Sequence, residues 1–219
     1  MPCVRAHAGS GAAVDPATSG PHHFFVAYGP EAALIVVDVQ NDFADPKGAL
    51  YVRGGEDVVP VANREIRRAR EAGAVVVYTQ DWHPESTPHF EKDGGIWPVH
   101  CVQGSWGAEL HPELLRVEAI SVKSGANGTD GYSAFRERHP LTGEETDTGL
   151  ADQLRARGVK RVVVLGLATD YCVRATALDA VREGFATTVL REGVRPVDRQ
   201  PGDGERALEE MRQAGIEVS

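Results

Sequence analysis

Short apolar runs alternate along most of the chain with longer, charged stretches of helical character. Six of the apolar runs have the length of strands and lie at 33–38, 75–80, 119–122, 161–166, 186–190 and 216–218. Helical patterns fall between them, near 58–72, 149–157, 171–183 and 204–214. Several runs consist almost entirely of β-branched residues or leucine, which is typical of strands covered on both faces. The alternation predicts an α/β fold with a three-layer, doubly wound, mostly parallel sheet.

Glycine marks the points where the predicted helices give way to strands. A charged helical stretch, a glycine and an apolar run follow one another at Gly73, Gly158, Gly184 and Gly215. Glycine just past a helix end takes the left-handed conformation at little cost, and the arginines before it suit the negative end of the helix dipole. Each junction therefore predicts a helix end followed directly by a strand.

Two stretches of the chain do not follow this alternation. Residues 1–29 are rich in small residues, proline and histidine without a helical or strand period, so we expect a flexible N-terminal extension before one domain over 30–219. Within that domain, the stretch 81–118 is rich in Pro, Gly, His and Trp and shows only weak helical signs near 107–116. A connection of that length is usually functional or disordered, and its Trp and His content favours function.

Charge and cysteine usage exclude several classes of partner. The net charge is −9 and there is no dense cluster of lysine or arginine, so we expect no nucleic-acid partner. No apolar run approaches the length of a membrane span, and no signal-peptide core is evident. The three cysteines, Cys3, Cys101 and Cys172, are too few and too widely spaced for a disulfide framework. These features predict a cytoplasmic protein in a reducing compartment.

Polar residues stand where four of the predicted strands end. Asp38 ends the first strand, Asp81 follows the second, Lys123 follows the third, and the segment 168–172 follows the fourth. The carboxyl ends of parallel strands meet at one edge of a sheet, where ligands bind in this architecture. We therefore expect these groups to converge.

Cys172 is the candidate nucleophile because it lies at a strand-to-helix junction. Unpaired N–H groups at a helix N-terminus favour a thiolate and can also hold an oxyanion. Asp38 could take the thiol proton, and Lys123 could supply a cation beside Asp38. Each residue also has a plainer interpretation: a small buried side chain for Cys172, a turn cap for Asp38 and a solvated surface residue for Lys123.

A second group of residues could hold a metal ion. Asp81 and His83 are two positions apart, so in an extended segment their side chains point the same way, and His89 and His100 follow in the same long connection. Two or three histidines with one carboxylate are typical of catalytic zinc, iron or manganese sites. Cys101 could be a ligand, although packing is the simpler role for it.

Five blocks taken together resemble the nicotinamidase/pyrazinamidase family, within the isochorismatase-like cysteine hydrolases. The resemblance covers about 32–219, and its blocks are 38–43 (DVQNDF), 81–83 with 89–90 (DWH, HF), 97–104 (WPVHCVQG), Lys123 with 132–135 (YSAF), and 166–173 (GLATDYCV). One part departs from the family pattern. Ser124 follows Lys123 and Gly131 precedes Tyr132, where relatives often have glycine and serine, so the shape of this loop is open.

The resemblance implies a role for each matching residue. Asp38, Lys123 and Cys172 match a catalytic triad. The implied metal ligands are Asp81, His83 and His100, with His89 a ligand in some relatives. A cis peptide between Leu167 and Ala168 would aim the Ala168 N–H, with that of Cys172, into an oxyanion hole. The implied substrate contacts are Phe43, Trp97, Tyr132 and Leu167, of which Phe43 and Trp97 match walls that sandwich a pyridine ring.

The resemblance also implies an activity. A metal-dependent cysteine amidohydrolase of this kind converts nicotinamide to nicotinate and ammonia through a thioester, as a step of NAD salvage. One divalent metal is implied, zinc first, with iron or manganese as alternatives. A homo-oligomer is left open. Two other interpretations stay open: the same machinery acting on another small amide such as pyrazinamide, and a non-catalytic metal-binding protein of the same fold.

Overall fold

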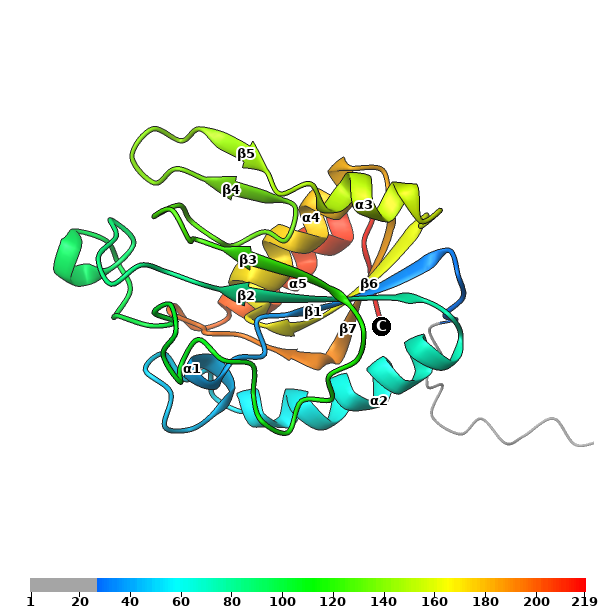
Figure 1. The fold of residues 1–219 in the computed structure, drawn as a ribbon, viewed down its shortest axis with the longest axis horizontal. Helices are drawn as coiled ribbons and strands as arrows, with labels where there is room; N and C mark the ends of the chain where they lie inside the picture. The colour runs from blue at the N-terminus through cyan, green and yellow to red at the C-terminus, as the bar shows by residue number, and fades with distance from the viewer. Residues whose placement is uncertain (1–26) are drawn as a thin grey trace, which may run out of the picture.

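A six-stranded parallel sheet forms the centre of the protein. The computed structural model describes residues 27–219, so most of the predicted N-terminal extension lies outside the described residues. The strand order is β3-β2-β1-β6-β7-β8, and every neighbouring pair is parallel (Figure 1). The strands are β1 (Ala32–Val37), β2 (Val75–Asp81), β3 (Ile120–Ser124), β6 (Arg161–Leu167), β7 (Ala186–Arg195) and β8 (Glu217–Val218).

Helices cover both faces of the sheet and give the expected three layers. On one face lies α2 (Val58–Glu71), which packs against alternate β1 residues such as Leu34 and Val36. On the other face lie α3 (Leu150–Ala156), α4 (Arg174–Arg182) and α5 (Asp203–Gln213), packed against Ala33 and Ile35. Because both faces of β1 are buried, its sequence is apolar at every position. The predicted fold class is confirmed.

The shorter elements include some that the sequence pattern did not predict. A two-stranded antiparallel hairpin, β4 (Arg136–Arg138) with β5 (Glu145–Asp147), stands beside the main sheet, and α1 (Asn41–Ala44) follows β1. The hairpin strands have three charged or polar residues each, so they carry no apolar alternation. The weak helical signs near 107–116 were wrong, since that segment forms turns.

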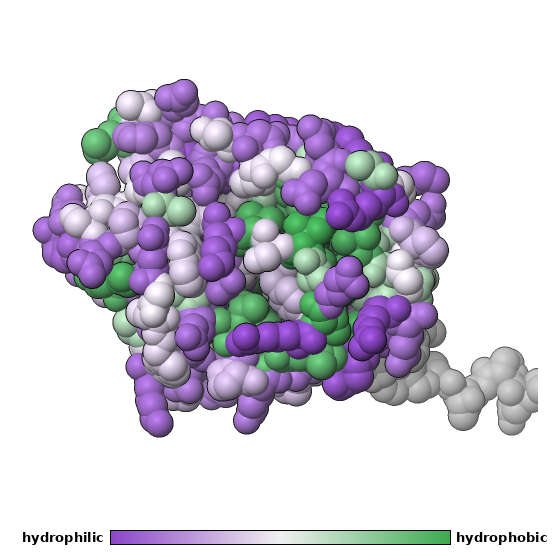
Figure 2. All heavy atoms as spheres, in the orientation of Figure 1, coloured by the Kyte–Doolittle hydropathy of each residue, from purple (hydrophilic) through white to green (hydrophobic). Residues whose placement is uncertain are grey.

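The surface seen from the β3 edge is largely polar. Apolar side chains gather near the middle of this face, between α2 and β3 (Figure 2). A surface hollow lined by Val75, Val117 and Ile120 lies there, at the amino ends of β2 and β3. The candidate catalytic residues lie at the other end of the strands, where their carboxyl ends meet. No helix within residues 27–219 is both long and apolar enough to cross a bilayer.

The order of the strands creates a crevice between β1 and β6. The chain leaves β1 to form β2 on one side and later returns to form β6 on the other, so the connections after these two strands diverge. The two strands approach closely at their carboxyl ends, where Val37 pairs with Gly166. A Cβ on Gly166 would lie 2.0 Å from the Val37 carbonyl oxygen, and its φ is 125°, so only glycine fits. Asp38 and Ala168 follow directly and flank the crevice.

Candidate active site

Asp38 and Cys172 meet at this crevice. Asp38 follows β1 with a positive φ of 47°, and Cys172 lies in one π-helical turn, Thr169–Val173, that leads into α4. One ligand atom each of Asp38, Asp81 and Cys172 lie within 4.8 Å of one another, and all three residues are buried. The Thr79 hydroxyl donates to the Asp38 carboxylate and accepts from the Asp38 N–H at 3.1 Å. The sequence therefore predicted correctly that the thiol and this carboxylate come together.

The surroundings favour the uncharged form of both groups. Burial raises the pKa of the Cys172 thiol, and the carboxylates of Asp38 and Asp81 raise it further, while a backbone hydrogen bond from Ala168 opposes them. Burial and the Asp81 charge likewise raise the pKa of Asp38. The expectation of a favoured thiolate counted only the helix N-terminus, and burial and the two carboxylates act against it. A cation at the site would favour the ionised forms.

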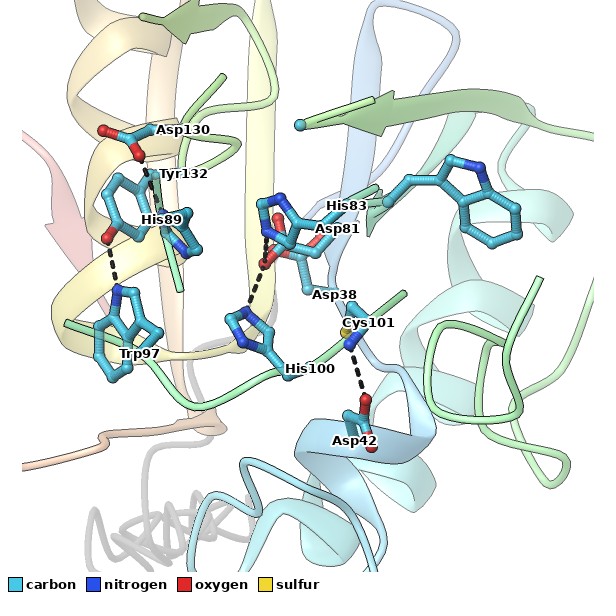
Figure 3. A network of polar contacts seen from close by, with 12 residues as sticks. Asp38, Asp42, Asp81, His83, His89, Trp97, His100, Cys101, Asp130 and Tyr132 are labelled. Atoms are coloured by element: carbon cyan, nitrogen blue, oxygen red, sulfur yellow. Dashed lines mark hydrogen bonds and ion pairs between the residues drawn. The ribbon is translucent and has the colours of Figure 1, made fainter. Parts of the chain in front are cut away.

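Three histidines converge on the same cluster. One ring nitrogen each of His83, His89 and His100 lies within 4.8 Å of the others, and all three rings are buried (Figure 3). The Nε2 atoms of His83 and His100 both lie 3.6 Å from the Asp81 Oδ2 atom. Although burial alone would raise it, these imidazoles hold the pKa of Asp81 below its ordinary value. The carboxylate is therefore ionised beside the histidine cluster.

The donor set fits a divalent metal ion. Both ring nitrogens of His83 and the Asp81 Oδ1 atom are buried without a hydrogen-bond partner among the described residues. Orphaned buried polar atoms are costly, and a bound cation would satisfy the Asp81 oxygen and one of the two His83 nitrogens. Three imidazoles and one carboxylate with open positions suit zinc, iron or manganese.

Carboxylate and carbonyl oxygens orient two of the histidines. His89 Nδ1 lies 2.9 Å from Asp130 Oδ1, and His100 Nδ1 lies 2.8 Å from the Pro98 carbonyl oxygen. Such partners fix the ring and its tautomer in metal sites and leave Nε2 for the metal. The sequence analysis gave Asp130 no role, because nothing in the spacing of 89 and 130 predicts the contact.

We expect Asp130→Asn to weaken metal binding by about 10–100-fold, the usual cost of losing such an outer partner. The equilibrium dissociation constant of zinc, measured in metal-free protein against a chelating indicator, checks this. Asp93→Asn is a matched control, because Asp93 bonds to Thr87 N, Lys92 and Ser86 in the same loop and not to a histidine. Equal affinity of the Asp130 variant and wild type would contradict a ligand role for His89.

A small cavity opens above the cluster and is walled by aromatic rings. Its lining includes Phe43, Trp97, Tyr132, Ala168 and Cys172. Trp97 Nε1 donates to the Tyr132 hydroxyl at 2.7 Å, and the Tyr171 ring meets the Trp97 ring edge to face with centroids 4.8 Å apart. The cavity therefore combines flat apolar walls with a polar floor, as small-ligand sites do.

Leu167 lies outside this cavity. Its side chain is fully buried in the apolar cluster on the α2 face of the sheet. The expectation that it contacts substrate is wrong: Ala168 lines the cavity, and Leu167 packs into the apolar cluster instead. The peptide bond between Leu167 and Ala168 is cis, as the resemblance implied.

Lys123 also lies away from the cluster. The strand β3 runs to Ser124, and its register pairs Lys123 with Gln80 and Ser124 with Asp81. Because Val122 and Ser124 point inward, Lys123 is exposed on the outer side, with its Nζ atom 3.4 Å from the centroid of the Trp82 ring. The structure therefore does not place Lys123 beside Asp38 as predicted: the strand ends two residues later than expected, and alternation turns the lysine outward.

Two further residues missed by the sequence analysis support the site. The Gln40 side chain bonds to both the N–H and the carbonyl oxygen of Asp81, each at 2.8 Å. Asp42 accepts the Cys101 N–H at 2.7 Å, and Cys101 has a positive φ of 45° next to His100. Both lie in the 38–43 block of the resemblance, in which the sequence analysis gave roles only to Asp38 and Phe43. The buried hydrogen bonds of Gln40 and Asp42 explain why polar residues occur in that block.

The fold and the site define a member of the isochorismatase family. Residues 32–219 match the model of the isochorismatase domain, and the chain belongs to that family. It is 41% identical over 204 residues to the nicotinamidase of Escherichia coli strain K12, an alignment that covers 85% of this chain and 93% of that protein.

Two solved structures are similar along nearly their whole length. The pyrazinamidase of Pyrococcus horikoshii in complex with zinc has a TM-score of 0.77 and 46% identity, over 87% of this chain and 99% of that one. The PnC1 protein of L. infantum in complex with nicotinate has a TM-score of 0.80 and 37% identity, over 89% of this chain and 95% of that one.

Proposed function

We propose that this protein hydrolyses nicotinamide to nicotinate and ammonia, with Cys172 as nucleophile and Asp38 as proton shuttle. One observation carries the proposal: a buried thiol and a buried carboxylate meet on the floor of a small aromatic-walled cavity, beside three convergent histidines. A relative named nicotinamidase and a structure that holds nicotinate support the choice of substrate. A flat heteroaromatic amide matches the shape and chemistry of the cavity.

The proposed reaction begins with the thiol. Asp38 accepts the Cys172 proton as the sulfur attacks the amide carbon, and the N–H groups of Ala168 and Cys172 hold the oxyanion. Asp38 then gives the proton to the amide nitrogen, the C–N bond breaks, ammonia leaves and a thioester remains. Asp38 next takes a proton from water, which attacks the thioester. Nicotinate leaves and the proton returns to the sulfur.

In this scheme, side chains around the thiol orient the substrate. Phe43 and Trp97 wall the cavity and would hold the ring, while Tyr132 fixes the Trp97 indole through its hydroxyl. Asp81, His83, His89 and His100 would hold one divalent metal ion. Bound there, the ion supplies an electrophilic anchor for a ring nitrogen and a positive charge that favours the ionised forms of Asp38 and Cys172.

Ammonia release by the purified protein tests the function. Nicotinamide, pyrazinamide and unrelated small aliphatic amides should be compared in one competition assay. Nicotinamide should have the highest kcat/KM. A clear preference for another amide would assign the same machinery to a different substrate. No release from any amide by the zinc-loaded protein would leave a metal-binding protein of the same fold.

Removal of the metal should abolish turnover. A chelator removes the ion that would position the substrate, so we expect no measurable ammonia release from metal-free protein and recovery on adding zinc, manganese or iron. Binding of nicotinate to the metal-free protein, measured by calorimetry, should weaken in parallel. Unchanged nicotinate affinity without metal would contradict the anchoring role.

The wider setting follows from the same proposal. We expect a cytoplasmic enzyme, because its nucleophile is a free cysteine that must stay reduced. We expect its partner to be the small-molecule substrate, with no nucleic-acid or membrane partner. Light scattering would measure whether the protein forms a homo-oligomer. The domain over 30–219 should fold and act without the N-terminal extension.

A further inference from the structure

Arg199 packs against the aromatic wall of the cavity, which is formed by Trp97, Tyr132 and Tyr171. Its guanidinium carbon lies 5.3 Å from the centroid of the Trp97 ring, within the range of a cation–π interaction. The same side chain interacts with the Tyr171 hydroxyl: burial raises the pKa of that tyrosine, and the charge and hydrogen bond of Arg199 oppose the rise. Trp97 and Tyr171 line the cavity, whereas Arg199 is exposed and does not. The arginine therefore contacts the wall from outside.

The guanidinium of Arg199 has no carboxylate within ion-pair distance in the part of the chain that the structure describes. The charge of Asp203 acts on it, but Asp203 forms its ion pair with Arg206. The two aromatic side chains are therefore the contacts that hold the guanidinium in place.

The segment that carries this arginine, the strap 196–199, is fixed to the turn that contains the thiol. The two carboxylate oxygens of Asp170, in that turn, accept the N–H groups of Val197 and Asp198 at 2.9 Å each. Asp198 has a positive φ of 53°, and its Oδ1 atom accepts the Gly204 N–H at 2.8 Å. Val197 also lines the cavity. The position of the strap is thus set by hydrogen bonds on both sides.

The Trp97 indole is held on its other sides by tyrosines. Its Nε1 atom donates to the Tyr132 hydroxyl at 2.7 Å (Figure 3), and the Tyr171 ring meets it edge to face. Arg199 completes this set of contacts. A wall that is ordered before a ligand arrives loses less side-chain freedom on binding, so each contact that orders it should strengthen binding.

We propose that Arg199 is a positioning residue that holds the Trp97 and Tyr171 rings from outside, and that it sets the affinity of the cavity for flat heteroaromatic ligands without taking part in the acyl transfer. The inference rests on the proposed function, because that function supplies the ligand. It assigns Arg199 to binding and not to turnover.

Five variants test the inference: Arg199→Ala, Arg199→Lys, Trp97→Leu, the double variant of Arg199→Ala with Trp97→Leu, and the control Arg212→Ala. Arg212 is an exposed arginine in the last turn of α5, paired with Glu209 at 3.4 Å, and it lines no part of the cavity. The measured quantities are kcat and KM for nicotinamide in zinc-loaded protein, and the dissociation constants of nicotinate and of nicotinamide by calorimetry. Nicotinamide binding is measured in the Cys172→Ala background, where the proposed chemistry cannot proceed.

We expect Arg199→Ala to raise KM and both dissociation constants by about 2–6-fold, the range of one exposed cation–π contact, with kcat close to wild type. Arg199→Lys should keep most of the affinity, because an ammonium group still makes a cation–π contact, although it does not stack as a guanidinium does. Adding Arg199→Ala to Trp97→Leu should cost nothing further, and Arg212→Ala should match wild type.

Two results would overturn the inference. Unchanged KM and dissociation constants in Arg199→Ala would show that the arginine does not order the wall. A nicotinate dissociation constant that rises by about 10-fold or more, while that of nicotinamide stays at the wild-type value, would show that the guanidinium binds the ligand carboxylate directly.

A measurement without ligand separates this inference from the proposed function. Hydrogen exchange of the Trp97 indole N–H, followed by NMR with the indoles of Trp82 and Trp106 as internal references, reports local opening of the wall. It should be faster in Arg199→Ala than in wild type, and equal rates would refute the role of Arg199. Wild-type protein that neither binds nor hydrolyses nicotinamide would refute the proposed function and leave the exchange rates to decide that role.

Discussion

Replacing Cys172 by alanine should abolish ammonia release from nicotinamide. Removing the nucleophile of an acyl-transfer enzyme costs on the order of 10⁴–10⁶-fold in kcat, because no other group can form the covalent intermediate. The substitution deletes one sulfur atom at the cavity floor, so nicotinate should still bind and the fold should persist. Ammonia release, calorimetric binding of nicotinate and thermal unfolding measure the three properties.

Cys101→Ala provides the matched control. Cys101 is the other cysteine among the described residues, is fully buried and makes only a weak contact from its sulfur to the Gly107 carbonyl oxygen at 3.9 Å. Its alanine variant should retain most of the wild-type rate. A Cys172→Ala protein that keeps the wild-type rate would show that the chemistry does not pass through this sulfur.

Replacing Asp38 by asparagine should separate turnover from thiol reactivity. Turnover should fall by about 10²–10⁴-fold, since the group that shuttles every proton in the scheme is lost. The thiol should become more reactive, because the Asp38 charge raises the pKa of Cys172. A raised pKa leaves less thiolate at a given pH, and its removal moves thiolate formation to lower pH.

Alkylation of metal-free protein by iodoacetamide measures the second effect. In wild type, the Cys172 rate should stay low at neutral pH and rise only above the ordinary titration range of a cysteine thiol, since burial and the two carboxylates raise the pKa. The curve of Asp38→Asn should lie at lower pH. A curve at the same or higher pH, or a variant with full turnover, would contradict the pairing of Asp38 with Cys172.

Most of the fold follows from apolar periodicity. The six strands of the main sheet and its four long helices were each predicted to within a few residues, except that β7 extends to Arg195 and α4 is preceded by a π-helical turn. Runs such as 162–165 are apolar at every position because both sheet faces are covered. The β4–β5 hairpin escaped prediction because its strands are short, exposed and charged.

The candidate site was predictable where it depends on strand ends and not where it depends on side-chain direction. Asp38, Asp81 and Cys172 converge because the carboxyl ends of parallel strands share an edge. The position of Lys123 was not predicted, because the strand continues two residues beyond its expected end. Its register then decides that Ser124 points inward and Lys123 outward. The contact of Asp130 with His89 joins two loops, and no local pattern encodes it.

The covalent intermediate is the most direct test of the central claim. Zinc-loaded protein should be mixed with nicotinamide, quenched in acid during turnover, digested and analysed by mass spectrometry, with hydroxylamine added in a parallel reaction. A nicotinoyl group should appear on the peptide that contains Cys172, and hydroxylamine should divert the product to nicotinoyl hydroxamate. An unmodified Cys172 peptide in protein that is turning over, together with no hydroxamate, would contradict the thioester route.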